Sequence, residues 1–164
     1  MLKGKKIVLR SLHYSDLIFL DNIENNPENW QFGGEKRKYT SKELAAYIKN
    51  ATTNILIAKQ YRFIIDLNGV PIGIIDLFDY TLSSVGVGII IAESYRKKGF
   101  AREALDLVVD YVFSTLGVKK VCASVVKDNL ASIKLFHSCD FQLQKENKDS
   151  QYFIKLAANQ LWKY

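Results

Sequence analysis

A basic turn of four residues, Arg96 to Gly99, has the residue types that hold a phosphate group. The apolar run before it, 85–92, is rich in β-branched residues and too short to cross a membrane, so it predicts a buried strand. After the turn, apolar residues recur at helical spacing over 104–116. The first N–H groups of a helix lack partners and carry partial positive charge, so this arrangement can bind an anion. A solvated basic turn is the alternative interpretation.

The turn matches neither of two common phosphate-binding loops. A Walker loop needs an earlier glycine and a Lys-Ser/Thr pair, but no glycine stands at the required spacing before Gly99 and residues 100–101 are Phe-Ala. Gly86 and Gly88 begin a dinucleotide fingerprint, but Ile91 occupies the position of its third glycine. These glycines also lie inside the expected strand, where glycine more often marks a bulge or a close backbone approach.

Two motifs resemble the GNAT acetyltransferase family. Residues 96–101, Arg-Lys-Lys-Gly-Phe-Ala, are similar to the family's R/Q-x-x-G-x-G/A signature, whose loop holds the pyrophosphate of acetyl-CoA. Residues 129–136, Asn-Leu-Ala-Ser-Ile-Lys-Leu-Phe, followed by Phe141, resemble its N-x-x-S/A-x-x-L-Y/F…G-F block. The resemblance covers nearly the whole chain and is closest to the spermidine and ribosomal-protein acetyltransferase branches. It implies an acyltransferase that moves an acetyl group from acetyl-CoA to a primary amine.

The resemblance also implies where the cosubstrate acetyl-CoA binds. The family's fourth strand splays from the fifth and leaves backbone groups free for the pantetheine amides; here that strand is the run 85–92, in which Gly86 and Gly88 fit a bulge. Backbone N–H groups of this strand can also polarise the thioester carbonyl. The implied cofactor-binding residues are Ile89, Ile90, Ile91, Arg96, Lys97, Lys98, Gly99, Phe100, Ala101, Arg102, Asn129, Ser132 and Phe136.

Acetyl transfer by direct attack needs a group that holds the incoming ammonium and removes its proton. Asp76 matches an acidic position of the family's polyamine branch, and a carboxylate inside an apolar strand is costly to bury unpaired. We therefore expect Asp76 to be the catalytic residue and to face a substrate ammonium; alternatively, Arg62 or another basic neighbour satisfies it structurally. The expected acceptor-binding residues are Asp76, Glu24, Glu28 and Trp30.

Three residues depart from the family pattern. Phe136 stands where many relatives have a tyrosine that protonates the departing thiolate, and Asp140 replaces the glycine of the G-F pair. Gly86 stands where polyamine-acetylating relatives have a glutamate. The acceptor therefore stays open between a polyamine, another small amine and a protein or peptide N-terminus. A GNAT-fold protein that binds acyl-CoA with little or no turnover is the alternative function, and an RNA-binding α/β domain is a third.

Sequence patterns predict the elements that position these residues. Thr40 and Glu43 form a capping box that opens a helix through about Asn50, and Asn68-Gly69 predicts a hairpin turn. The resemblance orders the elements as an α/β fold, β-α-α-β-β-β-α-β-α-β-β, with a mixed sheet of six to seven strands and splayed central strands. The other expected elements are strands over 7–10, 62–67, 70–78, 118–126, 141–146 and 152–156, a helix from 15 or 16 to about 25, and a helix from 129.

The segment 28–40 reads as a loop with a turn at Gly33-Gly34. Its aromatic residues Trp30, Phe32 and Tyr39 are unusual for a loop. They either fold back on the core or form a wall of the acceptor pocket, where the resemblance places the first two helices.

Length and composition bound the remaining possibilities. The 164 residues, 48% of them hydrophobic, predict a single domain spanning 1–164. The net charge of +6 is dispersed, so a polyanionic cofactor explains it as well as nucleic acid does, and we expect no nucleic-acid partner. The two cysteines and two histidines show no disulfide or metal-ligand spacing. No signal peptide or membrane span is apparent, so we expect a cytoplasmic protein without a membrane partner, and a homo-oligomer is possible.

Overall fold

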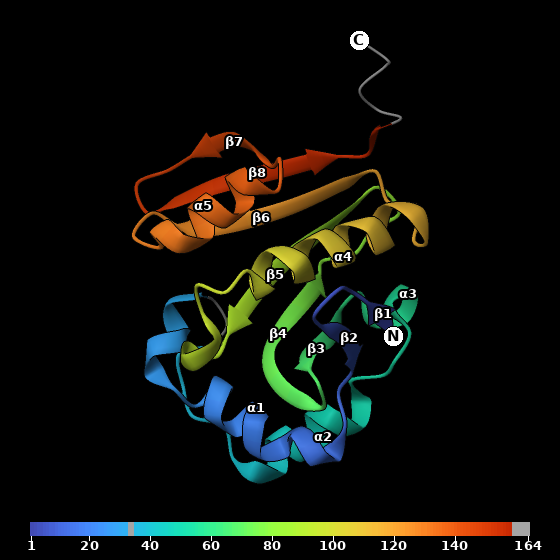
Figure 1. Ribbon diagram of the computed structural model, residues 1–164, viewed down its shortest axis with the longest axis vertical. Helices are drawn as coiled ribbons and strands as arrows, with labels where there is room; N and C mark the ends of the chain where they lie inside the picture. The colour runs from blue at the N-terminus through green and yellow to red at the C-terminus, as the bar shows by residue number, and fades with distance from the viewer. Residues whose placement is uncertain (33–34, 159–164) are drawn as a thin grey trace.

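The computed structural model describes residues 1–32 and 35–158. The strands of these residues form one eight-stranded sheet (Figure 1). The strand order is β1-β2-β3-β4-β5-β6-β8-β7, in which β5 and β6 are parallel and the other neighbouring pairs are antiparallel. The strands are β1 (Leu2–Lys3), β2 (Val8–Ser11), β3 (Tyr61–Leu67), β4 (Val70–Phe78), β5 (Ser84–Ile91), β6 (Lys120–Val126), β7 (Gln142–Glu146) and β8 (Ser150–Leu156).

The α-helices are α1 (Leu17–Glu24), α2 (Ser41–Asn50), α3 (Ile55–Ala58), α4 (Phe100–Ser114) and α5 (Leu130–Ser138). Three short 3-10 helices are η1 (Tyr14–Asp16), η2 (Pro27–Phe32) and η3 (Glu93–Tyr95). In the described part of the chain, no helix is both long enough and apolar enough to cross a membrane.

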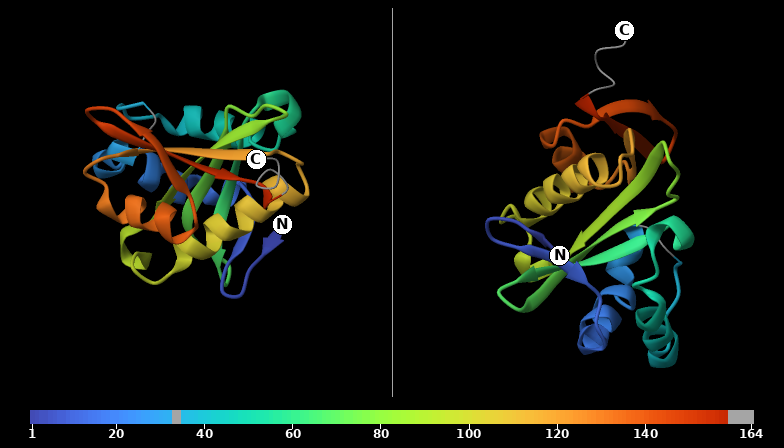
Figure 2. Two further views of the ribbon diagram at one scale, coloured as in Figure 1. Left: turned by 90° about the horizontal axis from the view of Figure 1, so that it is seen from above. Right: turned by 90° about the vertical axis from the view of Figure 1, so that its right-hand side faces the viewer.

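Helices cover both faces of the sheet (Figure 2). α4 and α5 pack on one face over a core that includes Phe63, and α1 and α2 pack on the other over a core that includes Ile64 and Ile74. Successive residues of a strand point to opposite faces. Arg62 on β3 and Asp76 on β4 have the same alternation as Ile64 and Ile74, so the fold places both on the α1–α2 face.

The parallel pair β5–β6 is joined only over its first three residues. Ser84–Gly86 pair with Lys120–Cys122, and the described residues of the two strands show no pairing beyond them. On its other side β5 pairs with β4 without interruption as far as Ile91. Figure 1 shows β6, β8 and β7 leaning away from β4 and β5. The predicted splay of the central strands is confirmed, and it leaves one edge of β5 open after Gly86.

Local sequence signals located two further features correctly. The Thr40 hydroxyl accepts from the backbone N–H of Glu43 at 3.1 Å, and the Thr40 N–H donates to the Glu43 carboxylate at 2.7 Å, which completes the predicted capping box of α2. Asn68 and Gly69 both have positive φ, 52° and 86°, as a tight hairpin between β3 and β4 requires.

Two expectations about the chain were wrong, and two short elements were not predicted. The described residues contain eight strands, because β1 adds a two-residue pair with β2, and the short helix α3 was not predicted. The segment 28–40 is not all loop, since its first residues belong to η2. Gly86 and Gly88 form no bulge, because the β4–β5 register is regular from Gly73 to Phe78. The missing Cβ of Gly86 instead makes room for the ring of Phe78, which a side chain there would overlap.

A buried ion network joins the edge of the sheet to α1. The guanidinium of Arg10 donates to both oxygens of Asp16 at 2.9 Å and to Asp66 at 2.7 Å. Asp16 also accepts from the backbone N–H of His13 at 2.8 Å and is 2% exposed. Burial works against its charge, but the hydrogen bonds from Arg10 and His13 outweigh burial and hold the pKa of Asp16 below its usual value.

We expect Asp16→Asn to lower the free energy of unfolding at pH 7 by about 2–3 kcal/mol. This loss is smaller than that for a buried ion pair whose remaining charge has no partner, because Asp66 still neutralises Arg10. The Asp16 carboxylate binds its proton less tightly in the folded chain than in the unfolded one. It therefore stabilises the fold above about pH 4, and this contribution is lost as the pH falls through the lowered pKa. Urea unfolding between pH 7 and pH 3 measures both effects.

The matched control is Glu35→Gln, which removes an ion pair to Arg37 whose side chains are 47% and 67% exposed. Exposed pairs contribute little, so this variant should unfold like the parent protein. Equal acid sensitivity in the parent and in Asp16→Asn would show that the Arg10 network does not set the acid stability.

Candidate active site

Two adjoining cavities occupy the opening between β5 and β6. The larger, the splay cleft, has a volume of about 690 Å³ and is bounded by β4, β5, β6 and α5. The smaller, the turn cavity, has a volume of about 340 Å³ and lies beside the β5–α4 turn. Both are lined by Ile89, Ile90, Asn129 and Ser132, so together they form a continuous channel along the open edge of β5.

The turn before α4 lines the turn cavity, and no described side chain caps the backbone N–H groups that begin the helix. Lys97 and Gly99 both have positive φ, 61° and 84°, and α4 begins at Phe100 with no side chain capping it. A Cβ placed on Gly99 would meet no atom within 4 Å, so the space above this glycine is open. The N-terminus of a 15-residue helix that lacks a side-chain cap can bind an anion.

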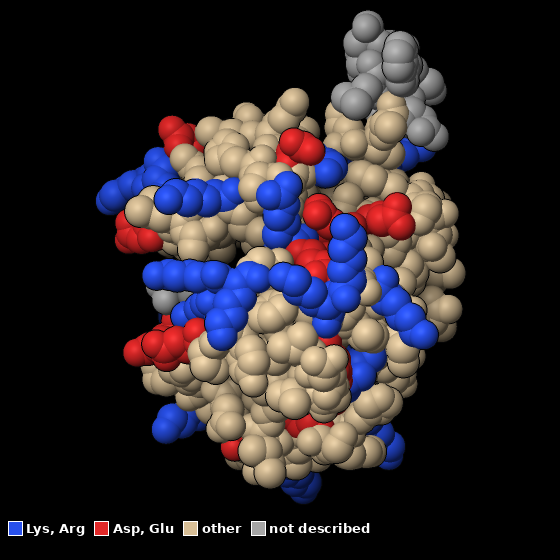
Figure 3. All heavy atoms as spheres, in the orientation of Figure 1, with Lys and Arg blue, Asp and Glu red and all other residues tan. Residues whose placement is uncertain are grey.

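Basic side chains surround this turn. Figure 3 shows lysine and arginine side chains in a band across the middle of the face, at the level of the start of α4. Lys97 and Arg102 line the turn cavity, whereas Lys98 lies beside the ring of Tyr95, with its Nζ 5.9 Å from the ring centroid. Electrostatic attraction to this band favours a polyanionic ligand such as a pyrophosphate.

Arg96 lines the turn cavity and also connects two parts of the fold. Its Nε donates to the carbonyl oxygen of Ile91 at 2.8 Å, and its Nη2 donates to Oδ1 of Asn29 at 3.3 Å. The amide of Asn29 is buried and also donates to the Ile23 carbonyl at 3.0 Å. The side chain of Arg96 therefore ties the end of β5 to η2, a connection that the sequence did not reveal.

The turn cavity brings together most of the predicted cofactor-binding residues. Three of the predicted residues do not line it: Lys98, Phe100, which is buried in the core under α4, and Phe136, which lines the splay cleft instead. Tyr95, Ala131 and Leu135 also line the turn cavity and were not predicted, although Tyr95 precedes the basic turn and the other two lie in the Asn129 motif.

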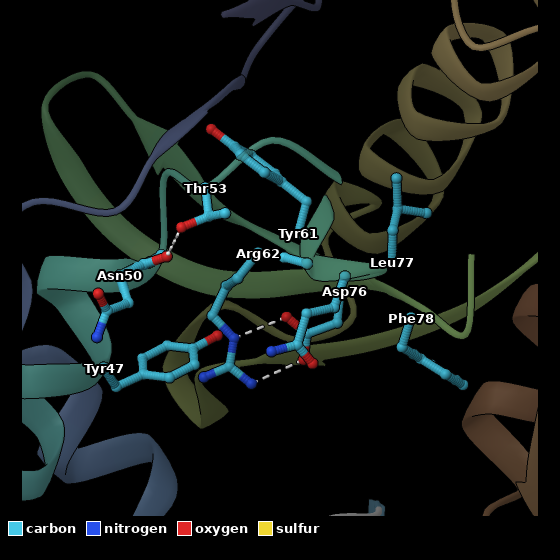
Figure 4. Close-up of a pocket in the computed structure, with 11 residues that line it drawn as sticks. Tyr47, Asn50, Thr53, Tyr61, Arg62, Asp76, Leu77 and Phe78 are labelled. Carbon is cyan, nitrogen blue, oxygen red and sulfur yellow. Dashed lines mark hydrogen bonds and ion pairs between the residues drawn. The ribbon is translucent and has the colours of Figure 1, made fainter. Parts of the chain in front are cut away.

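A cluster of one arginine and two carboxylates, Arg62, Asp76 and Glu24, lines the splay cleft. Arg62 Nε donates to Oδ1 of Asp76 and Arg62 Nη2 to Oδ2, each at 2.7 Å (Figure 4). Arg62 Nη1 donates to Oε1 of Glu24. The guanidinium also lies 5.2 Å from the ring centroid of Tyr47. Burial disfavours the charge of Arg62, but Asp76 and Glu24 outweigh burial and hold its pKa well above the usual value.

Of the two predicted partners for Asp76, a substrate ammonium or a basic neighbour, the structure contains the second, because Arg62 pairs with Asp76. The two residues are opposite each other in the β3–β4 register, which the position of the hairpin turn could have indicated. Two carboxylates share one guanidinium, so the cluster of Glu24, Arg62 and Asp76 has one surplus negative charge. All three residues line the splay cleft, as does Lys36, so the surplus belongs to this cluster and not to the cleft as a whole; it favours a cationic ligand beside Glu24 and Asp76.

The aromatic segment before α2 divides between the cleft and the core. Trp30 lines the splay cleft and donates its indole N–H to the Glu24 carbonyl at 2.9 Å. Tyr39 packs against the core under α1 and α2, and Glu28 is exposed and lines none of the cavities described here. The side chain of Phe32 and the Gly33-Gly34 turn lie outside the described residues.

Phe136 lies on α5 at the base of the splay cleft. It is 3% exposed, and its ring centroid is 5.0 Å from that of Phe141 and 6.0 Å from that of Phe153. Ser132 lies one turn earlier on the same helix and lines both cavities. The Asn129 side chain caps α5 by accepting from the Ser132 N–H at 3.2 Å.

Comparisons with known proteins agree with this geometry. Residues 6–142 match the model of the family described as acetyltransferase (GNAT) domain. A spermidine N(1)-acetyltransferase of Vibrio cholerae is 29% identical over 92% of this chain and 87% of its own length, and one of Escherichia coli K12 is 26% identical over 89% and 78%. The crystal structure of the Vibrio cholerae spermidine N-acetyltransferase with CoA and spermine superposes with a TM-score of 0.83 at 25% identity, covering 96% of this chain and 99% of that one.

We expect Gly99→Val to weaken CoA binding at least about tenfold, or roughly 1.4 kcal/mol. A branched side chain would enter the open space above the helix N-terminus, and the positive φ would strain it by about 1–2 kcal/mol. Gly117→Val is the matched control, because Gly117 also has a positive φ, 68°, and open space, but follows the far end of α4. Calorimetric titration with CoA should show a loss of affinity for Gly99→Val alone. Equal affinities for the two folded variants would contradict the phosphate site.

We expect Phe136→Tyr to retain or increase the rate of acetyl transfer and to change the alkaline limb of its pH profile, because it supplies a phenolic proton beside the cleft. Phe141→Tyr adds the same hydroxyl to a neighbouring ring that does not line the cleft. It should therefore lower stability without moving the profile. A Phe136→Tyr profile identical to that of the parent would mean that the thiolate takes its proton elsewhere.

Proposed function

The chain belongs to the GNAT family of acetyltransferases and is an acetyl-CoA-dependent N-acetyltransferase, and we propose that its acceptor is a small aliphatic polyamine. The surplus negative charge of the Glu24, Arg62 and Asp76 cluster is the observation that carries this proposal. Two spermidine N-acetyltransferases among the relatives support the same acceptor class. Gly86 stands where relatives of the polyamine branch have a glutamate, and the cluster of Glu24, Arg62 and Asp76 would supply the negative charge in its place.

Acetyl-CoA supplies the acyl group as a thioester that an amine can attack directly. The open edge of β5 after Gly86 would hold the pantetheine amides, since backbone groups there lack a partner strand. The N–H groups that begin α4, together with Lys97 and Arg102, would hold the pyrophosphate. In the ternary complex a β5 N–H would stabilise the negative charge that develops on the thioester oxygen.

The acceptor reaches the cleft as an ammonium, because an alkylamine has a pKa of about 10. We assign its binding and its deprotonation to Asp76 and Glu24. Both oxygens of Asp76 accept hydrogen bonds from Arg62, whereas Oε2 of Glu24 accepts none from the described residues. An ammonium can bind to this oxygen and to the outer lone pairs of Asp76, and its proton can leave through the same carboxylates or a water.

The departing thiolate needs little help. A free thiol has a pKa of about 8.5, so a thiolate is a tolerable leaving group near neutral pH. Phe136 has no proton to donate, and the Ser132 hydroxyl or water in the cleft can provide one.

The proposed function is tested by turnover of acetyl-CoA with a panel of amines, read by the appearance of free CoA thiol. Spermidine and spermine should be acetylated faster than single amino acids, and a protein or peptide N-terminus should be a poor acceptor. Binding of acetyl-CoA without turnover of any amine would replace this proposal with an acyl-CoA-binding function.

We expect Asp76→Asn to raise KM for the best amine and to lower kcat, together at least about tenfold in kcat/KM, because it removes an ammonium ligand and a proton acceptor. CoA affinity should not change, since the β5–α4 turn is a separate element. Asp79→Asn is the matched control: Asp79 follows β4 with a φ of 50°, which asparagine tolerates, and lines none of the described cavities. Full kcat/KM in folded Asp76→Asn would make the residue a structural partner of Arg62.

A further inference from the structure

A third cavity, the side cavity, adjoins the splay cleft at the Arg62–Asp76 ion pair. Its volume is about 230 Å³, and it shares Arg62, Asp76 and Phe78 with the splay cleft (Figure 4). It is bounded by the end of α2, by α3 and by the adjoining ends of β3 and β4. A molecule in the splay cleft can therefore extend into the side cavity by passing the edge of Asp76.

The side cavity has the chemistry of a site for an alkyl chain with a cationic end. Its wall combines the rings of Tyr47 and Tyr61 with two alanines. Its charged lining residues are Arg62 and Asp76, and two carboxylates already bind the Arg62 guanidinium. No described lining residue therefore offers an unneutralised cation to a ligand with a carboxylate or phosphate group. The side-chain oxygen of Asn50 accepts no hydrogen bond from the described residues and is available to an ammonium.

The volume limits the size of the occupant. At about 30 Å³ per water-sized group, the side cavity of about 230 Å³ has room for roughly seven heavy atoms, which is enough for one aminoalkyl arm. The surplus negative charge of the cluster acts on both sides of Asp76. A second ammonium in the side cavity would therefore be favoured over a neutral group, and a neutral group over an anion.

We propose that the side cavity binds the distal aminoalkyl arm of the acceptor while the reacting amine lies in the splay cleft. This inference rests on the proposed function and deepens it, because it makes the enzyme selective for long aliphatic diamines and polyamines. Selectivity arises because a longer chain buries more methylene groups and places its second ammonium beside Asp76, Asn50 and the tyrosine rings.

Acceptors of equal length test the chemistry of the distal end. We expect kcat/KM to fall at least about tenfold from 1,6-diaminohexane to 6-aminohexanol, and to fall further for 6-aminohexanoate. Calorimetric binding of the three amines to the CoA-bound protein should give the same order without requiring turnover. An equal response to the diamine and the amino acid by both measures would overturn the inference.

Two small side chains in the wall test the place of binding. Ala51→Leu and Ala58→Leu each fill the side cavity, Ala58 being exposed and therefore tolerant of a larger residue. Each should reduce the affinity and kcat/KM for 1,6-diaminohexane about tenfold and leave propylamine unchanged. Ala46→Leu is the matched control, since Ala46 is exposed on α2 and lines none of the described cavities.

The outcomes separate this inference from the proposed function. If polyamines are acetylated but neither filled variant loses affinity for the long diamine, the side cavity is not the acceptor site and the acetyltransferase assignment stands. If no amine is turned over yet the CoA-bound protein binds the long diamine and loses it in the filled variants, the site stands and the proposed reaction fails. If no amine is turned over and the long diamine does not bind, both the proposed function and the side-cavity inference are overturned.

Discussion

The separation of β5 from β6 is the constraint on which the rest of the structure depends. The two strands pair over three residues and then diverge, so the remaining N–H and C=O groups on one edge of β5 have no strand partner. A backbone group left buried without a partner costs about 1–3 kcal/mol, so such an edge persists only where water or a ligand can reach it. The splay cleft and the turn cavity provide that access, and both follow from this one interruption of the sheet.

A second constraint is the charge of Arg62. A guanidinium that is 13% exposed must be paired, and two carboxylates from different elements, Asp76 on β4 and Glu24 at the end of α1, pair with it. The same contacts hold α1 against the sheet and leave one negative charge in excess at the cleft. One cluster therefore helps to position α1 and, in the proposed function, also recognises the cationic acceptor.

Much of the site could be predicted because its signals are local. The strand, basic turn and helix around Gly99, the hairpin at Asn68-Gly69 and the capping box of Thr40 each depend on neighbouring residues, and the structure contains all three. Contacts between distant segments could not be predicted in this way. Arg96 meets Asn29 across 67 positions, and Gly86 accommodates a ring from the adjacent strand instead of forming a bulge.

The family, the order of the main elements and the residue types of the basic turn could be predicted without a structure, because motif spacing and short-range periodicity express them directly. Which side chains face one another depends instead on the folded arrangement of the whole chain. It paired Asp76 with Arg62, turned Lys98 toward Tyr95 and away from the turn cavity, and opened a side cavity beyond the ion pair. These outcomes depend on the register of β3 with β4 and on how α2 and α3 pack beside it. Such long-range packing is a property of the whole chain, which no single motif contains.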